Sequence, residues 1–127
     1  IFKKRSFNVS YLNDKLSEFS DTLLLPYYSK DISYLAYPII LKEAKHISCF
    51  QLRRELEKDG IETRPLFGCI PTQQPAYGFL KKHYKNKLPN AEYIGMNGFY
   101  IGCHQYLKKE NLDFIVLTFA KILKGKR

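Results

Sequence analysis

The chain has 127 residues and a mass of 14.9 kDa, which suffices for one modest domain and excludes a second full one. Hydrophobic residues make up 45% and charged residues 26%, a balance typical of a soluble globular protein rather than a disordered tail. No apolar run approaches the roughly 20 residues of a membrane span, and residues 1–5 lack the features of a secretory signal. Because the sequence opens on Ile1 rather than Met, we expect a fragment.

The chain is strongly basic. Its 21 Lys and Arg against 12 Asp and Glu give a net charge of +9 and a pI near 9.5. This excess favours anionic partners by long-range attraction and leaves nucleic acid, a membrane surface and phosphorylated metabolites open. The basic residues are scattered, with clusters at both chain ends and over residues 81–87. For the clusters at the ends, solvated surface charge is the simpler explanation.

The cysteines and histidines predict neither a disulfide scaffold nor a metal site. The three cysteines are odd in number and include no CxxC pair, and the three histidines lie far apart in the sequence. We therefore expect no bound metal. The cysteines are interpreted as small buried groups of a protein in the reducing cytoplasm: Cys49, Cys69 and Cys103.

The first third of the chain predicts a helix and two strands. The helix covers residues 4–19, where apolar residues recur with the spacing of one helical face: Val9, Leu12, Leu16 and Phe19. Residues 22–28 and 32–41 are apolar on both faces and rich in β-branched, aromatic and Leu residues, which is typical of buried strands. Pro38 lacks a backbone N–H, so that part of the second strand should lie at an edge or a bulge.

The clearest helix signature follows in the middle of the chain. Ser48 and Gln51 have the spacing of a capping box, and Gly60 can end the helix in a left-handed conformation. One face of this helix is apolar: Cys49, Leu52 and Leu56. We expect a short strand over residues 61–67 and then an irregular loop over 68–75, where one Gly and two Pro oppose regular structure.

The remaining elements complete the predicted fold. They are a helix over residues 76–84, a Lys-Asn-Lys turn, a short helix from Pro89 to before Gly98, a strand over 99–104 and a strongly amphipathic helix over 109–124. The order αββαβ(α)βα predicts an α/β (α+β) fold with a small, open, partly antiparallel sheet flanked by helices. The capped helix and the terminal helix should lay their apolar faces on that sheet.

One segment can carry chemistry, although no Gly-rich phosphate loop, HExxH, GxSxG or paired-carboxylate motif supports a self-contained hydrolase or kinase. In GIETRPLFGCIPTQQPAY, from Gly60 to Tyr77, a strand leads Arg64 into an irregular loop, where binding residues are common. The planar guanidinium of Arg64 can hold a carboxylate or a phosphate. Spacing alone slightly favours a surface ion pair with Glu62 or another acid instead.

Other residues of interest each allow two explanations. Gln73 and Gln74 can bind sugar hydroxyls or hydrogen-bond within their own loop. Phe67 and Tyr77 can stack on a sugar or a base, although aromatic residues beside a helix more often belong to the core. Along the last strand, a ligand or another chain could approach the backbone between two side chains, although packing is the simpler explanation for both: Tyr100 and His104, with Gly102 between them.

The same segment, followed by LPNAEYIGMNGFYIGCHQYL at residues 88–107, resembles the C-terminal part of the DegT/DnrJ/EryC1/StrS family of pyridoxal-phosphate-dependent sugar aminotransferases. The succession GIETRPxF, QPxY, LPNAE and a glycine-bearing strand before the last helix makes the resemblance fairly specific. It spans essentially the whole chain, because the start resembles the helix that opens the family's small domain: Arg5, Asn8, Tyr11 and Leu16.

The resemblance implies a fold type I enzyme, usually a homodimer, that transfers an amino group from glutamate to a nucleotide-linked keto sugar. A large N-terminal domain, absent here, would hold pyridoxal phosphate and the Schiff-base lysine. Residues 1–127 would be the small C-terminal domain that closes the substrate cleft, with no cofactor and no activity alone. The role of the Schiff-base lysine is assigned to no residue here, so no catalytic residue is expected. The implied substrate-facing residues are Arg64, Phe67, Gln74 and Tyr77.

Departures from the family pattern keep other functions open. Many relatives have a histidine in place of Thr72, and some have one in place of Leu66, so the sugar contacts of those histidines cannot be carried over. A subgroup that shares Thr-Arg-x-Leu-Phe and Gln-Pro with this chain dehydrates the sugar at C3 instead of aminating it. A basic nucleic-acid-binding module and a free-standing remnant are further alternatives. Scattered charge without an RNP, KH or helix-turn-helix signature speaks against nucleic acid, and no nucleic acid or membrane partner is expected.

Overall fold

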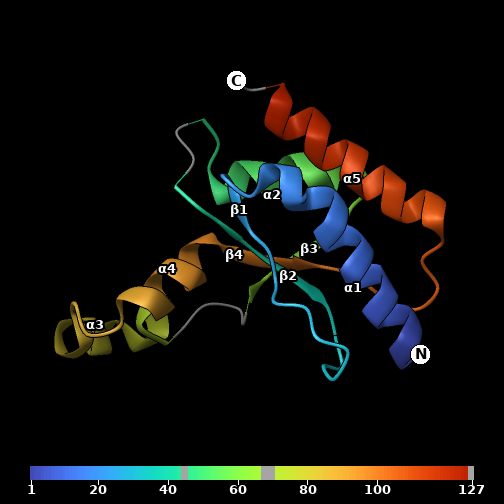
Figure 1. Ribbon diagram of the computed structural model, residues 1–127. Helices are drawn as coiled ribbons and strands as arrows, with labels where there is room; N and C mark the ends of the chain where they lie inside the picture. The colour runs from blue at the N-terminus through green and yellow to red at the C-terminus, as the bar shows by residue number, and fades with distance from the viewer. Residues whose placement is uncertain (44–45, 67–70, 126–127) are drawn as a thin grey trace.

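The computed structural model of the chain describes residues 1–43, 46–66 and 71–125 (Figure 1). Its helices are α1 (Phe2–Leu16), α2 (Cys49–Lys58), α3 (Gly78–Tyr84), α4 (Pro89–Asn97) and α5 (Lys109–Lys124). Its strands are β1 (Leu23–Leu24), β2 (Tyr37–Leu41), β3 (Thr63–Pro65) and β4 (Gly98–Ile101). None of the helices in these ranges is long and apolar enough to cross a bilayer.

The four strands form one open sheet in the order β1-β2-β4-β3, and every neighbouring pair is antiparallel. The expected α/β fold with an open sheet is therefore confirmed, and the antiparallel order extends to all three pairs rather than part of the sheet. β3 lies at one edge, where only β4 binds it. This edge position leaves one side of β3 free of ladder bonds.

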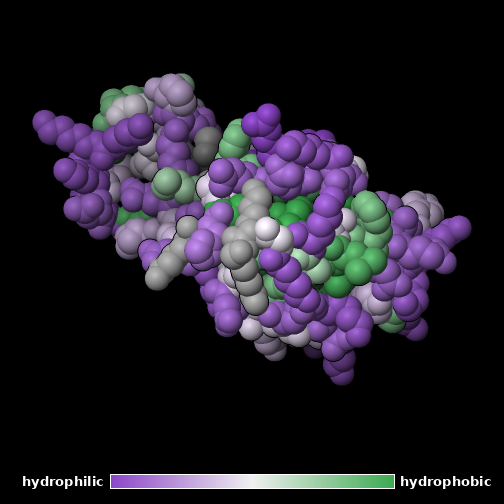
Figure 2. Space-filling view, turned by 90° about the horizontal axis from the view of Figure 1, so that it is seen from above, coloured by the Kyte–Doolittle hydropathy of each residue, from purple (hydrophilic) through white to green (hydrophobic). Residues whose placement is uncertain are grey.

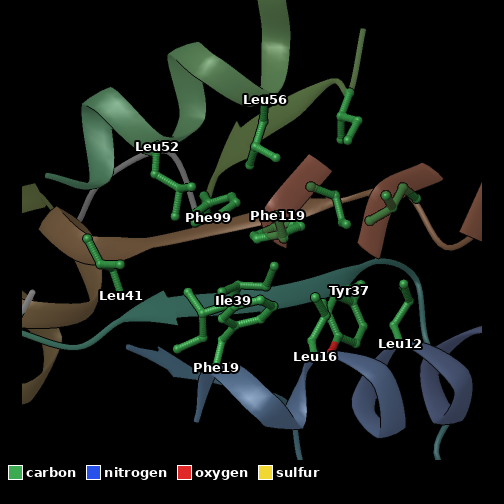
Figure 3. Packing of buried hydrophobic residues seen from close by; sticks show 14 of the residues in the cluster. Leu12, Leu16, Phe19, Tyr37, Ile39, Leu41, Leu52, Leu56, Phe99 and Phe119 are labelled. Atoms are coloured by element: carbon green, nitrogen blue, oxygen red, sulfur yellow. The ribbon is translucent and has the colours of Figure 1, made fainter. Parts of the chain in front are cut away.

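The core lies on one face of the sheet, under α1, α2 and α5 (Figures 1 and 3). Residues that pair across antiparallel strands share a face, and the pair Ile39 and Phe99 is completely buried, whereas the neighbouring pair of Pro38 and Tyr100 is partly exposed. Figure 3 shows side chains from α1, the 3-10 turn after it and α2 converging on this buried face, including Leu16, Phe19, Leu52 and Leu56. The opposite face is left half-exposed.

The capped helix is confirmed. The Ser48 hydroxyl accepts a hydrogen bond from the Gln51 N–H at 3.2 Å, and the Gln51 side chain accepts one from the Ser48 N–H at 3.0 Å. These bonds satisfy donors that the first turn of a helix otherwise leaves free. Gly60 follows the helix with a φ of 86°. The terminal helix α5 also has the expected bounds, and both helices contribute buried leucines to the core.

The two early strands are much shorter than the sequence pattern predicts. The expectation of strands over 22–28 and 32–41, apolar and buried on both faces, is wrong, because β1 has two residues and Leu24 is half-exposed. In the segment between β1 and β2, backbone carbonyls accept hydrogen bonds from side chains instead of from a neighbouring strand. The Tyr34 hydroxyl donates to the carbonyl of Tyr27 at 2.9 Å, and the Asn13 amide donates to the carbonyl of Pro26 at 2.9 Å.

Several smaller expectations have mixed outcomes. Pro38 does lie at a local edge, because β1 pairs only with the last two residues of β2. The first helix ends at Leu16 and continues as a 3-10 turn, and the strand predicted over 99–104 ends at Ile101. In the described part of the 61–67 strand, only Thr63–Pro65 is a strand. The turn at 71–73 is 3-10 helix without ladder bonds.

Residues 71–97 form a limb that stands apart from the helical body in both Figure 1 and Figure 2. It contains two 3-10 turns, α3 and α4, and none of the side chains of α3 and α4 is buried. Figure 2 shows that its visible surface is mostly hydrophilic. The Tyr93 hydroxyl donates to the carbonyl of Leu41 at 2.9 Å and so ties the limb to β2.

Candidate functional site

A cavity of about 420 Å³ lies at the β3 edge of the sheet, between β3, the segment after β4 and the first half of α5. This volume is in the range of small-ligand pockets, roughly 300 to 1,000 Å³. Polar and apolar groups both line it. The polar ones include Glu62, Arg64, Tyr100, His104 and Asn111, and the apolar ones include Ile101, Phe114 and Ile115.

Arg64 presents its guanidinium at this cavity from the edge strand β3. Its Nε and Nη2 atoms lie 3.0 and 2.7 Å from the same carboxylate oxygen of Glu62. The ion pair with Glu62, which the sequence spacing slightly favoured for Arg64, is therefore present. Both side chains are largely exposed, 64% for Arg64 and 75% for Glu62, and such pairs contribute only about 0 to 1 kcal/mol. An anion that enters the cavity can therefore replace Glu62 at small cost.

Tyr100, Gly102 and His104 line the same cavity, although β4 ends before two of them. The buried side-chain amide of Asn8 fixes the backbone at Cys103 and His104. The Asn8 side chain donates to the carbonyls of Cys103 and His104 at 3.2 and 2.9 Å. Since Asn8 belongs to α1, a residue far away in the sequence holds the turn that carries His104.

Arg5 and Tyr11 extend this connection along α1. The guanidinium of Arg5 donates to the carbonyl of Leu35 at 2.7 Å and to the side chain of Gln105 at 3.2 Å. The Tyr11 hydroxyl donates to the carboxylate of Asp113 on α5. Sequence reasoning used Arg5, Asn8 and Tyr11 only to support a resemblance and gave them no role. The available signal was three polar residues, three apart, on a helix with a buried side.

Contacts and burial shift the pKa values of several ionisable groups in the described part of the chain. The hydrogen bond from Lys109, and next that from Tyr11, hold the pKa of Asp113 below its ordinary value. Burial raises the pKa of the thiols of Cys49 and Cys103, which are free and buried as expected. Cys69 lies outside the described residues. No group of three or more metal-binding His, Cys, Asp or Glu side chains occurs among the residues that the structure does describe.

Two of the other predicted substrate-facing residues, Gln74 and Tyr77, lie on the limb and not beside Arg64. Gln74 precedes a 3-10 turn, and Tyr77, which is 45% exposed, ends that turn with its ring 6.4 Å from the ring of Phe79. Neither is among the described residues that line the Arg64 cavity. The neighbouring Gln73 donates to the carbonyl of Glu92 within the limb at 2.9 Å. Phe67 lies outside the described residues.

Comparison of the sequence with known proteins identifies its family. The sequence model of the DegT/DnrJ/EryC1/StrS aminotransferase family matches residues 1–120. The chain belongs to this family. The DegT/DnrJ/EryC1/StrS match includes Arg64 and the other lining residues of its cavity as well as the whole limb.

Two curated relatives match most of this chain, and the match takes up less than a third of each relative's length. The lipopolysaccharide biosynthesis protein RfbH of Salmonella typhimurium is 32% identical over 121 residues, 94% of this chain and 28% of the relative. The GDP-4-keto-6-deoxy-D-mannose 3-dehydratase of Escherichia coli O55:H7 is 26% identical over 112 residues, 87% of this chain and 29% of the relative. The chain thus spans less than a third of each of these curated relatives.

A solved structure confirms the fold. The E. coli GDP-4-keto-6-deoxy-D-mannose-3-dehydratase with bound hydrated pyridoxal phosphate superposes with a TM-score of 0.72 at 24% identity. The match covers 92% of this chain and 30% of that one. At this identity the likeness is one of fold, and it shows that the same arrangement of helices and strands occurs as part of a longer chain.

The described residues do not fit a covalently held pyridoxal phosphate. Every lysine that the structure describes is exposed to solvent, whereas a Schiff-base lysine is activated in a desolvated pocket or beside another cation. No lysine occurs among the described residues that line the Arg64 cavity. This part of the family fold therefore provides a guanidinium, an imidazole and hydrogen-bonding groups, but not the amine that would bind the cofactor.

Proposed function

We propose that this chain is the small C-terminal part of an enzyme that uses pyridoxal phosphate to transfer an amino group from glutamate to a nucleotide-linked keto sugar. In that reaction the amino group and a hydrogen replace the carbonyl oxygen of the sugar, and glutamate becomes the corresponding 2-oxo acid. The cofactor and its lysine belong to the large domain of the parent enzyme, which we place in the cytoplasm as a homodimer. Support comes from the family match and from the exposure of every lysine within residues 1–43, 46–66 and 71–125.

The observation that carries the proposal is the weak pairing of Arg64 beside a cavity of ligand size. Arg64 would exchange Glu62 for an anionic group of the substrate, because a guanidinium binds carboxylate or phosphate oxygens through parallel hydrogen bonds. Tyr100 and His104 would hydrogen-bond to substrate hydroxyls from the same wall. The apolar side of the cavity, formed in part by Phe114, would exclude water.

In the parent enzyme, the limb would form a second wall of the substrate cleft, apart from the wall that carries Arg64. In this proposal Gln74 binds a sugar hydroxyl, and the rings of Phe67 and Tyr77 wall the sugar pocket, since aromatic faces pack well against sugar rings. The net charge of +9 would help gather a diphosphate-bearing substrate. Such steering raises the association rate and weakens as salt is added.

A second candidate reaction is dehydration of the same class of substrate at C3. The observation that favours it is the curated 3-dehydratase relative, 26% identical to this chain over 112 residues. Product analysis of the whole enzyme with a nucleotide-linked 4-keto sugar and glutamate separates the two. A product that has gained nitrogen supports amino transfer, and a product that has lost the C3 oxygen while keeping its carbonyl supports dehydration. A keto sugar that remains unchanged contradicts both.

The role of Arg64 is tested by Arg64→Ala in the whole enzyme. We expect kcat/KM for the keto sugar to fall roughly tenfold or more, since hydrogen bonds to charged groups contribute about 1.5 to 3 kcal/mol. Arg54→Ala is the matched control, because Arg54 is an exposed arginine of α2 that does not line the cavity. Equal kcat/KM values for the two variants would remove Arg64 from the substrate site.

A further inference from the structure

A second cavity, separate from the Arg64 cavity, lies within the limb. It is an open hollow with a volume of about 530 Å³, lined by the turn at 71–73, α3 with the residues after it, and α4. Three lysines line it: Lys81, Lys82 and Lys85. The structure thus gathers most of the basic cluster of residues 81–87 around one hollow, instead of spreading it over open surface.

The positive charge of this limb cavity is not neutralised by the protein. All three lysines are exposed, and none makes an ion pair within the described ranges. Lys81 and Lys82 belong to the last turn of α3, and Lys85 follows that helix directly. One carboxylate, that of Glu92, lines the same cavity. Three cationic groups against one carboxylate leave an excess that an anion would neutralise.

Thr72 provides a second, independent observation. Its side chain is only 7% exposed, it lines the limb cavity, and its hydroxyl oxygen is buried without a hydrogen-bond partner among the residues described. A buried hydroxyl without a partner is unfavourable. Rotation about χ1 moves the hydroxyl between three staggered positions, and a threonine hydroxyl can donate to an oxygen that enters the cavity.

We propose that the limb cavity binds a diphosphate group, held by the ammonium groups of Lys81, Lys82 and Lys85 and by the hydroxyl of Thr72. A diphosphate presents several charged oxygens, so it can accept from more than one ammonium group at once, and charge-assisted hydrogen bonds of this kind are strong. The group can arrive as free pyrophosphate or as part of a nucleotide. This site stands independently of the activity proposed above.

The test measures binding of three probes to the whole chain by calorimetry: inorganic pyrophosphate, GDP and guanosine. We expect pyrophosphate and GDP to bind, guanosine to show no binding, and both affinities to fall as salt is raised. Tighter binding of GDP than of pyrophosphate would indicate a nucleotide as the source of the group, and equal binding would indicate free pyrophosphate. Absence of pyrophosphate binding, with or without GDP binding, overturns the proposal.

Two matched variants locate the bound probe. The triple variant Lys81→Gln, Lys82→Gln, Lys85→Gln removes the lysines of the cavity. The control Lys3→Gln, Lys30→Gln, Lys87→Gln removes the same number of charges at exposed lysines that do not line it. We expect the first to weaken pyrophosphate binding roughly tenfold or more and the control less than about threefold. Equal losses would mean that only net charge matters, which overturns the site.

A measurement on the unaltered chain keeps the test independent of how the variants fold. Pyrophosphate should shift the amide NMR signals of Thr72, Lys82 and Lys85 and leave those of Lys3 and Lys30 in place. Thr72→Val, which keeps the shape and removes the hydroxyl, should weaken pyrophosphate binding about threefold or more. Shifts confined to residues outside the limb would contradict the proposal.

Discussion

Asn8 is a buried polar residue of α1 that binds the segment after β4. Its amide donates to the carbonyls of Cys103 and His104, and its side chain is completely buried. Asn8→Ala would leave both carbonyls without this donor, and we expect the free energy of unfolding to fall by about 1 to 3 kcal/mol. Urea denaturation measures the change. Asn90→Ala, at an exposed position of α4, should shift it by less than about 0.5 kcal/mol, and an equal loss in both variants would contradict the role of Asn8.

Asp113 is expected to make the stability sensitive to acid. Its pKa is lowered in the folded chain, first by Lys109, whose Nζ lies 2.7 Å from its carboxylate, and then by Tyr11. A lowered pKa means that folding favours the carboxylate, so its contribution is present above the ordinary value of 3.8 and is lost as pH falls through the folded-state pKa. The stability difference between the unaltered chain and Asp113→Asn should therefore shrink in acid.

Urea titrations well above and well below pH 3.8 measure this difference. Asp21→Asn is the control, because Asp21 is exposed and makes no ion pair within the described ranges. A difference for Asp113→Asn that is the same at both pH values would show that the contacts with Lys109 and Tyr11 do not favour the charged form. The effect is expected to be small, since the group is at the surface.

Among the elements, α2 depends on the glycine that follows it. Gly60 has a φ of 86°, a conformation that costs a residue with a Cβ about 1 to 2 kcal/mol, so we expect Gly60→Ala to lower the free energy of unfolding by that amount. Gly78, at the start of α3, has equally open space for a Cβ and no positive φ. Gly78→Ala should leave stability unchanged or raise it by up to about 1 kcal/mol. Urea denaturation that gives both variants the same loss would contradict this explanation.

Elements set by local contacts could be predicted from the sequence, and those set by distant contacts could not. The capping box of Ser48 and Gln51 lies within four residues, so its pattern and its structure coincide. Residues 25–36 have strand-like composition, but their carbonyls bind the side chains of Asn13, Arg5 and Tyr34 instead of a neighbouring strand. Asn13 and Arg5 belong to α1, outside any short window around this segment, and this explains why the sequence predicted overlong strands.

In the candidate site, too, local contacts could be predicted from the sequence and distant contacts could not. The ion pair of Arg64 with Glu62 could be anticipated, because the two residues are neighbours on one segment. The contribution of α5 and of the segment after β4 to the cavity could not, since they join β3 only through the order of the strands. The same limit applies to Gln74 and Tyr77, which follow Arg64 closely in sequence and yet lie on the limb.

At the scale of the whole molecule, the two ends of the chain build one core. α1 and α5 pack side by side on the same face of the sheet (Figure 1), and each supplies buried side chains. Phe119 is completely buried, whereas Phe114 on the same helix is 50% exposed. Phe119→Ala should lower the free energy of unfolding by about 3 to 5 kcal/mol, and Phe114→Ala by less than about 1 kcal/mol. Similar losses for both would show that α5 does not stabilise the body through its buried face.

The limb stands in contrast to this body. The described side chains of α3 and α4 are at most partly buried, and the hydroxyl of Tyr93 provides a tether to β2. Segments with so little buried surface open locally at low free energy. Amide protons of the limb should therefore exchange with deuterium long before those of α2 and β4, and Tyr93→Phe should widen that gap without changing the exchange of the body. The limb would then unfold locally while the hydrogen bonds of the sheet stay intact.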